Sequence, residues 1–312
     1  MIPPSLRSIL PTSWFNQNAA AEELAERYVE GTIEGKISDL AGHRPRFVFC
    51  ATDMQFRTQW VFDTGRQVVG HDVAGYAAPS DRWTIAEAAA ASSCFPTVFS
   101  PVRVDDRLVG GSYGGPDAER LLADVELSDG GIYDNLGLEP VWRDHAVVLV
   151  SDAAPSLSVD PQLGALWHGL RYIVTLLEQA TDVRKRWLIS SFARGDLAGT
   201  YWGIAGDPGA YGYDGPGRPY SHELIRDVIS QVRIDFDVFS DGERGVLENH
   251  GYLMAEVAVG RHAKDLVAPD APPPAPPHPD WMDDAEVRSA LATSSRTRIL
   301  GRRFARARRR RR

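Results

Sequence analysis

Cysteine is scarce in this chain, and long apolar runs are absent from it. Only two cysteines, Cys50 and Cys94, occur among 312 residues, and both stand in apolar stretches. This usage excludes a disulfide framework and a cysteine-based metal site, and it indicates buried free thiols in a reducing compartment. No apolar run reaches the roughly 18 residues that a membrane-spanning helix needs, so we expect none.

The signatures of several common functions are missing as well. The first residues, M-I-P-P-S-L-R-S-I-L-P, lack a basic region followed by an apolar core, so we expect no secretion signal and a cytoplasmic location. The eight histidines include no H-x-x-x-H pair, which argues against a zinc site. Gly110–Gly115 lacks the lysine and the hydroxyl residue of a phosphate-binding loop. We therefore expect neither a metal nor a cofactor.

Charge is distributed unevenly along the chain. The formal net charge is −8, yet the segment Arg296–Arg312 holds ten arginines and no acid, which leaves 24 basic against 42 acidic residues elsewhere. Such a block suits a solvated tail, attraction to anionic lipid headgroups, or nonspecific contact with nucleic acid. We expect peripheral membrane contact through Arg296–Arg312 and no specific nucleic acid partner.

Hydrophobic periodicity predicts strands interleaved with helices. Compact apolar runs predict strands at residues 46–53, 58–63, 67–71, 124–128, 146–151 and 201–204, with a hairpin around Gly65. Helical spacing and capping residues predict helices at 19–31, 85–92, 161–186, 221–231 and 243–259. This alternation is typical of a layered α/β domain, which we place at residues 1–265. A proline-rich linker at 266–282 and a short helix with a disordered arginine-rich tail at 283–312 complete the predicted organisation.

The segment Asp129-Gly130-Gly131 is the strongest candidate for chemistry. It follows the strand at 124–128, and its two glycines permit a positive φ and a close backbone approach. A carboxylate on such a loop suits a general base beside a nucleophile. Taken alone, the same residues also fit an ordinary turn.

Three linked motifs give the chain a family resemblance. They are Ala51-Thr52-Asp53 with an aromatic hairpin behind it, A-S-S-C-F-P-T-V-F-S-P at residues 91–101, and D-G-G-I-Y-D-N at residues 129–135. In this order they resemble the patatin-like phospholipases, lipid acyl hydrolases with a Ser–Asp dyad, over roughly residues 20–260. The resemblance implies a layered α/β/α domain with a mostly parallel or mixed central sheet. It also implies that Asp129 is the proton acceptor and that Gly130 and Gly131 are the motif glycines.

Two elements of the family pattern are absent. We find neither the glycine-rich G-G-G-x-R-G loop that would stabilise the oxyanion nor, upstream of the first motif, the G-x-S-x-G elbow that would expose the nucleophile. The resemblance thus implies a domain that is incomplete at its N-terminus. We expect this chain alone to be inactive, with its serine nucleophile missing.

One literal match to the elbow pattern occurs at Gly110-Gly111-Ser112-Tyr113-Gly114. An elbow requires a buried strand before the serine, and D-D-R-L-V at residues 105–109 is a poor one. Ser112 therefore stays a weak candidate nucleophile. Asp53 also ends a strand, but we expect it to be structural.

Three hypotheses for function follow. The first is a patatin-like lipid acyl hydrolase that acts on a lipid or another acyl ester, in lipid metabolism, with Asp129 as its base. The second is a truncated, non-catalytic domain that binds lipid or a protein partner. The third, a nucleic-acid-binding protein driven by the arginine tail, predicts a steep dependence of affinity on salt.

Overall fold

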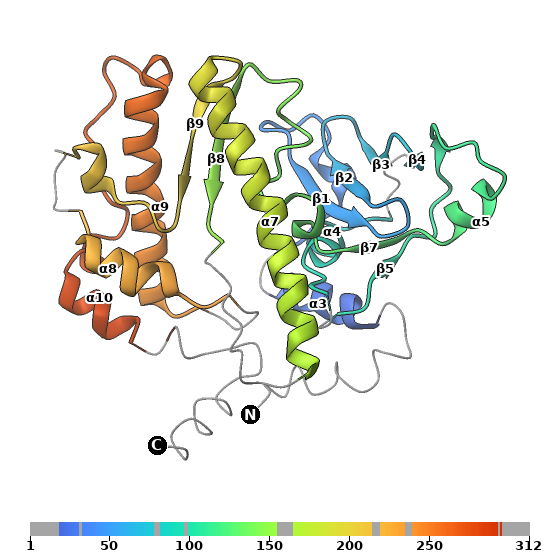
Figure 1. Cartoon of the computed structure of the whole chain (residues 1–312), viewed down its shortest axis with the longest axis horizontal. Coiled ribbons are helices and arrows are strands. Elements are labelled where there is room, and N and C mark those ends of the chain that lie inside the picture. Colours follow the sequence, from blue (N-terminus) through green and yellow to red (C-terminus); the bar gives the residue numbers. More distant parts are fainter. Residues whose placement is uncertain are drawn as a thin grey trace. The chain divides into compact units, whose positions relative to one another are not determined.

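The chain divides into two compact units in the computed structural model (Figure 1). The motif unit comprises residues 4–144 and 159–184, and the C-terminal unit comprises residues 1–3, 145–158 and 185–312. The structure describes residues 19–30, 33–77, 82–96, 99–154, 165–213, 219–234, 239–292 and 294, without the side chains of 19, 20 and 165–170. The arginine tail and the predicted start of the long helix at 161 lie outside the described residues.

The motif unit is built on an antiparallel sheet of seven strands. In chain order these are β1 (Val48–Asp53), β2 (Thr58–Asp63), β3 (Val68–His71), β4 (Gly75–Ala77), β5 (Val102–Arg103), β6 (Val109–Gly110) and β7 (Glu126–Ser128). Their order across the sheet is β5-β7-β1-β2-β3-β4-β6, and every neighbouring pair is antiparallel. The hairpin predicted around Gly65 is confirmed as the turn between β2 and β3.

All neighbouring strands of this sheet are antiparallel, whereas we expected a mostly parallel or mixed sheet. Strands β1 to β4 follow one another through turns of three or four residues. Parallel neighbours need a crossover connection of about a dozen residues or more, so such short turns force antiparallel pairing. Among the described strands, only β8 (Val147–Asp152) and β9 (Ala198–Gly203) are parallel, and the long helix α7 (Ala165–Arg194) connects them. The mixed α/β class is confirmed, whereas the mostly parallel sheet is not.

The motif unit also contains five short helices among its described residues. They are α3 (Ala19–Glu30), the 3₁₀ helix η1 (Ile37–Leu40), α4 (Ile85–Ser92), α5 (Ala118–Ala123) and α6 (Gly131–Asp134). α4 begins as predicted, because the Thr84 hydroxyl accepts from the Glu87 N–H while the Glu87 carboxylate accepts from the Thr84 N–H. α4 packs on α3, β1 and β7. The core beneath it includes Trp60, Phe62 and Leu127, all fully buried.

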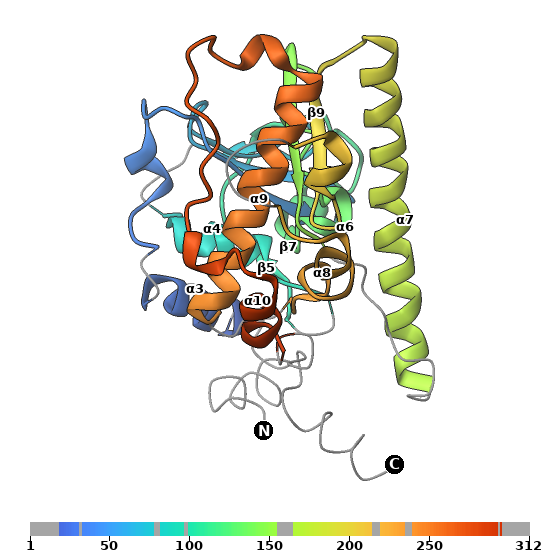
Figure 2. The ribbon, with the colours of Figure 1, turned by 90° about the vertical axis from the view of Figure 1, so that its left-hand side faces the viewer.

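The C-terminal unit places helices around the two parallel strands. These are η2 (Pro208–Tyr211), α8 (His222–Asp227), η3 (Ile229–Gln231), α9 (Asp241–His262), η4 (Lys264–Leu266), η5 (Pro279–Trp281) and α10 (Asp284–Ala290). α9 runs along β9 (Figure 2). The helix predicted at 221–231 is interrupted at Val228, where α8 ends and η3 begins.

The proline-rich segment after α9 is held along that helix. The Asn249 side chain accepts from the His278 N–H at 2.8 Å and donates to the His278 carbonyl at 2.7 Å. Val287 and Leu291, at and just after α10, join a buried cluster with Leu224 and Ile229. α10 thus contributes to the core of the C-terminal unit. The proposal that residues 1–265 form a domain remains a prediction.

Candidate active site

The register of β1 and β7 brings the first and third motifs together. β7 pairs antiparallel with β1, so that Thr52 faces Ser128 across the ladder and Asp53 faces Leu127. The residue that follows Ser128 is Asp129, which therefore leaves the sheet beside Thr52. The second motif joins them, because the backbone N–H of Asp129 donates to the Cys94 carbonyl at 3.0 Å.

Backbone hydrogen bonds fix the position of the Asp129 loop. The Thr52 hydroxyl donates to the Asp129 carbonyl at 2.8 Å and accepts from the Tyr133 N–H at 3.1 Å. The Gly130 N–H donates to the Ser92 carbonyl at 3.0 Å, at the end of α4. A strand, a helix end and a threonine hydroxyl together hold this loop. We conclude that the three motifs form one continuous structure.

The two motif glycines serve close packing rather than a special backbone angle. Gly130 has φ −60° and ψ −30°, which is right-handed helical backbone open to any residue, so the positive φ that we predicted is not used. A Cβ on Gly130, however, would lie 2.5 Å from the Cys50 carbonyl oxygen. A Cβ on Gly131 would lie 2.7 Å from the Asn135 side-chain oxygen. The close approach that the sequence predicted is confirmed.

The Asp129 carboxylate is partly buried and carries no compensating cation among the described residues. Its Oδ1 accepts from the Gly131 N–H at 2.7 Å, and its Oδ2 receives no hydrogen bond from the part of the chain that the structure describes. Burial raises the pKa of this carboxyl group, and the Gly131 hydrogen bond offsets only part of the rise. Such a carboxylate is a stronger base than an exposed aspartate.

The thiols near this loop are not nucleophiles. Burial raises the pKa of both Cys50 and Cys94 to about 12, and the negative charge of Asp134 or Asp129 adds to the effect. Both cysteines are free, as predicted; Cys94 is buried and Cys50 is partly exposed. At neutral pH both remain protonated and behave as small apolar side chains.

The second acid of the motif, Asp134, has a structural role. Its two oxygens accept from the backbone N–H groups of Leu136, Leu138 and Glu139 at 2.7–3.1 Å. Arg184 on α7 lies 3.5 Å from the same carboxylate and stacks over the Tyr133 ring. Asp134 thus closes the turn after α6 and connects it to α7.

Asp53 is also structural, as we expected. It is fully buried, contacts Nε2 of His71 at 2.8 Å, and accepts from the backbone N–H groups of Gln55 and Phe56 in the β1–β2 turn. Nδ1 of His71 accepts from the backbone N–H groups of Val73 and Ala74. Both side chains have their hydrogen-bonding capacity satisfied within the fold.

Ser112 lies away from Asp129 in the sheet. It follows β6, a pair of exposed residues at one edge, and β4, β3, β2 and β1 stand between β6 and β7. Ser112 is itself exposed, and α5 begins only at Ala118. The buried strand and the adjoining helix that an elbow requires do not flank it.

A second group of polar side chains, in the C-terminal unit, was not predicted from the sequence. Asp152, at the end of β8, lies 2.5 Å from Nζ of Lys185 and accepts from the Tyr201 hydroxyl at 2.7 Å. These residues are far apart in sequence and match no motif, so no sequence signal could have joined them. Among the described residues, no group of three or more His, Cys, Asp or Glu side chains could hold a metal ion.

Comparison with known proteins finds a similarity over the first part of the chain. Residues 2–142 match the model of the patatin-like phospholipase family, which confirms the resemblance read from the three motifs. The matched segment carries Thr52, the end of α4 and Asp129, and it nearly coincides with the first part of the motif unit. This segment is thus similar to the patatin-like phospholipases. No curated protein matches the chain significantly.

Proposed function

We propose that the protein hydrolyses acyl esters of lipids, with Asp129 as the proton acceptor for a serine on a segment that is not among these 312 residues. The observation that carries this proposal is the Asp129 carboxylate itself. It stands where three motifs meet, has one oxygen without a hydrogen bond from the described residues, and is paired with no described cation.

The reaction proceeds through an acyl-enzyme. The serine Oγ attacks the ester carbonyl carbon while its proton passes to the Asp129 carboxylate. Collapse of the tetrahedral intermediate breaks the bond to the alcohol oxygen, and the alcohol leaves with the proton from Asp129. Water then attacks the acyl-serine, again with Asp129 as base, and the carboxylic acid and free serine are released.

The raised pKa of Asp129 supports this role. A general base works best when its pKa lies nearer the working pH, and burial moves this carboxyl in that direction. An aspartate held in a close ion pair would have the opposite shift. Thr52 and the α4 end fix the loop through its backbone, so the side chain is positioned without neutralising its charge.

The experiment has two arms. We expect p-nitrophenyl ester hydrolysis by the 312-residue chain to stay at background, and we expect the reading frame upstream of Met1, or a neighbouring gene, to encode G-G-G-x-R and G-x-S-x-G. If the 312-residue chain hydrolysed the ester and Ser112→Ala abolished this activity, the proposal of a serine outside the chain would be wrong. No elbow in either place, together with lipid binding that Asp129→Asn leaves unchanged, would favour the non-catalytic alternative.

The place of action is part of the same proposal. We propose that the protein works in the cytoplasm and contacts anionic membrane surfaces through Arg296–Arg312, where its lipid substrates lie. None of the helices in the described ranges has both the length and the apolar character to cross a membrane. Ten arginines in one terminal segment provide an electrostatic attraction that would add to substrate binding.

A further inference from the structure

A pocket of about 300 Å³ lies in the C-terminal unit, separate from the residues assigned above to catalysis. It opens at the carboxyl ends of the two parallel strands, because Ser151 and Asp152 of β8 and Trp202 and Gly203 of β9 line it. In α/β proteins this end of parallel strands is where ligands bind. The volume is at the small end of the range for ligand pockets.

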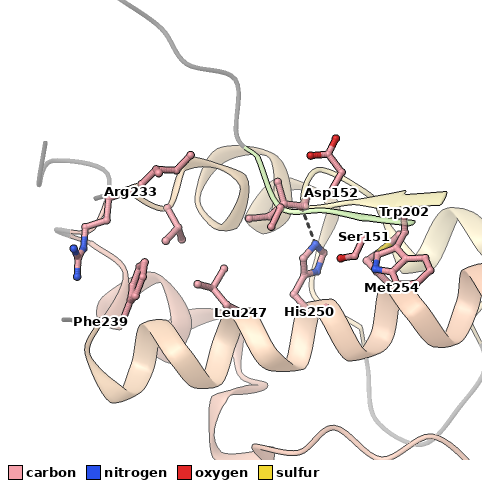
Figure 3. A pocket seen from close by; sticks show the side chains of 14 residues that line it. Ser151, Asp152, Trp202, Arg233, Phe239, Leu247, His250 and Met254 are labelled. Atoms are coloured by element: carbon pink, nitrogen blue, oxygen red, sulfur yellow. Dashed lines mark hydrogen bonds between the residues drawn. The ribbon is translucent and has the colours of Figure 1, made fainter. Parts of the chain in front are cut away.

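The wall of this pocket is mainly apolar. Trp202 and Met254 lie at one end and Phe239 at the other, with Leu247 and His250 between them (Figure 3). α9 contributes Leu247, His250 and Met254 at helical spacing, so one face of this helix forms the floor. An aliphatic chain would bury its surface favourably here.

The two charged side chains of the wall are already engaged. Asp152 is paired with Lys185, and the Arg233 Nε lies 3.0 Å from the Glu243 carboxylate, with both of these side chains less than one-tenth exposed. Arg233 also stacks on Phe239. A charged ligand would find no uncompensated partner in this wall and would lose its hydration on entry.

Among the described lining residues, His250 supplies the one buried side-chain nitrogen or oxygen atom without a hydrogen-bond partner. The residue is 2% exposed, and its Nε2 lies 2.8 Å from the Ile204 carbonyl. A carbonyl only accepts, so Nε2 carries the proton and donates. Burial lowers the pKa of His250, which keeps the ring neutral, although the Ile204 hydrogen bond opposes the shift. Nδ1 is therefore a bare acceptor, and it is buried without a hydrogen-bond partner among the residues that the structure describes.

A buried acceptor without a donor is unfavourable, and a ligand that donates to it would gain affinity. A hydroxyl group meets this requirement, whereas a carboxylate would bring its own lone pairs against Nδ1. Nδ1 has no accessible surface of its own, so a wall side chain must rotate to admit the hydroxyl. Met254, unbranched and flexible, is suited to such a movement.

We propose that this pocket binds an uncharged amphiphile, an aliphatic chain of about ten carbons ending in a hydroxyl that donates to Nδ1 of His250; the length is scaled from the cavity of about 150 Å³ that holds one benzene. The proposal does not depend on catalysis at Asp129, because binding alone is measured. A fatty alcohol is the simplest molecule of this class.

The test uses the full chain, 1-decanol as the probe, and calorimetry for affinity. We expect decanoate and decane to bind about tenfold or more weaker than decanol, because the first brings a charge and the second lacks the donor. Decanol should also shift the ¹⁵N resonance of His250 Nδ1. Equal affinity for the three probes, or an unchanged resonance, would overturn the proposal.

A pair of glycine variants locates the binding. Gly251 and Gly260 both lie on α9, and a Cβ at either meets nothing within 4 Å, but only Gly251 lines the pocket. Gly251→Leu should fill the pocket and weaken decanol binding about tenfold or more, while Gly260→Leu leaves it unchanged. Both changes raise helix propensity equally, so neither should unfold the helix. Undiminished binding by Gly251→Leu would place the ligand elsewhere.

Discussion

The burial of the Asp129 carboxylate opposes stability. Its carboxylate is partly buried with one backbone hydrogen bond and no described cation nearby, so ionisation is disfavoured in the folded chain. Because its pKa is raised on folding, the folded state binds this proton more tightly than the unfolded state. Stability therefore falls as the pH rises through the titration of Asp129.

Asparagine at this position should relieve the penalty. Asp129→Asn keeps an oxygen for the Gly131 N–H and removes the charge, so we expect it to raise the free energy of unfolding at pH 7. Near pH 3, where the carboxyl is protonated, the gain should vanish. Urea denaturation at the two pH values measures this difference, and a variant that is less stable than the parent at pH 7 would contradict the assignment.

Thr52 is the residue that positions the loop. Its hydroxyl donates to Asp129 and accepts from Tyr133, and it is 3% exposed. Thr52→Val keeps the shape and removes both hydrogen bonds, which leaves buried backbone groups unsatisfied at a cost of about 1–3 kcal/mol. Thr52→Ser keeps the hydroxyl and should lose much less. Equal losses in chemical denaturation would show that the hydroxyl does not matter.

The sequence pointed to Asp129 as a candidate, but it did not reveal the hydrogen bonds that position the Asp129 loop. The motif spacing and the family resemblance identified the carboxylate and its two glycines. The role of Thr52 depends on the register between β1 and β7, which no local pattern encodes. His250 lies in the helix predicted at residues 243–259, but the state of its Nδ1 depends on the contact of Nε2 with the Ile204 carbonyl, which the sequence does not reveal.

At the scale of elements, local signals predicted helices better than strand directions. The Thr84–Glu87 capping box fixed the start of α4, because both hydrogen bonds form within four residues. The apolar run at residues 46–53 is equally compatible with parallel and antiparallel neighbours, since buried strands of both kinds lack polar alternation. The short turns between β1, β2, β3 and β4 require antiparallel pairing, but a long connection allows either direction: β1 and β7 are antiparallel, whereas β8 and β9 are parallel.

The N-terminus of α9 should make stability sensitive to acid. Burial alone would raise the pKa of Glu243, but hydrogen bonds from Arg233, Ser294 and Ser240 lower it from 4.5 to about 2. A carboxyl with a lowered pKa stabilises the fold above its unfolded pKa, and this contribution is lost as the pH falls from about 4.5 to about 2.

Glu243→Gln should flatten the pH dependence of the free energy of unfolding in that window. Arg233→Met, which leaves the Glu243 charge buried without its partner, should cost about 3–5 kcal/mol at pH 7. Denaturation curves followed by tryptophan fluorescence measure both effects. An unchanged slope for Glu243→Gln would refute the role of this ion pair.

At the scale of the whole molecule, charge is separated between the body and its C-terminal segment. Ten arginines stand in Arg296–Arg312, and the remaining residues are strongly acidic. We expect the full chain to bind anionic vesicles in co-sedimentation at least about tenfold more tightly than a chain ending at Ser295, since each arginine near such a surface contributes roughly 1 kcal/mol and a tenfold change needs only about 1.4 kcal/mol. The difference should shrink with added salt. Equal sedimentation of the two chains would exclude the tail from membrane contact.

In the proposed reaction Asp129 is the base for a serine on another segment, and the rate of ester hydrolysis reports on that role. The measurement is ester hydrolysis by the chain joined to the segment that carries the nucleophile elbow, with Asp129 intact or changed to asparagine. We predict that Asp129→Asn lowers kcat by about 100- to 10,000-fold, the usual contribution of a general base. An Asp129→Asn enzyme that keeps its full rate would contradict the account.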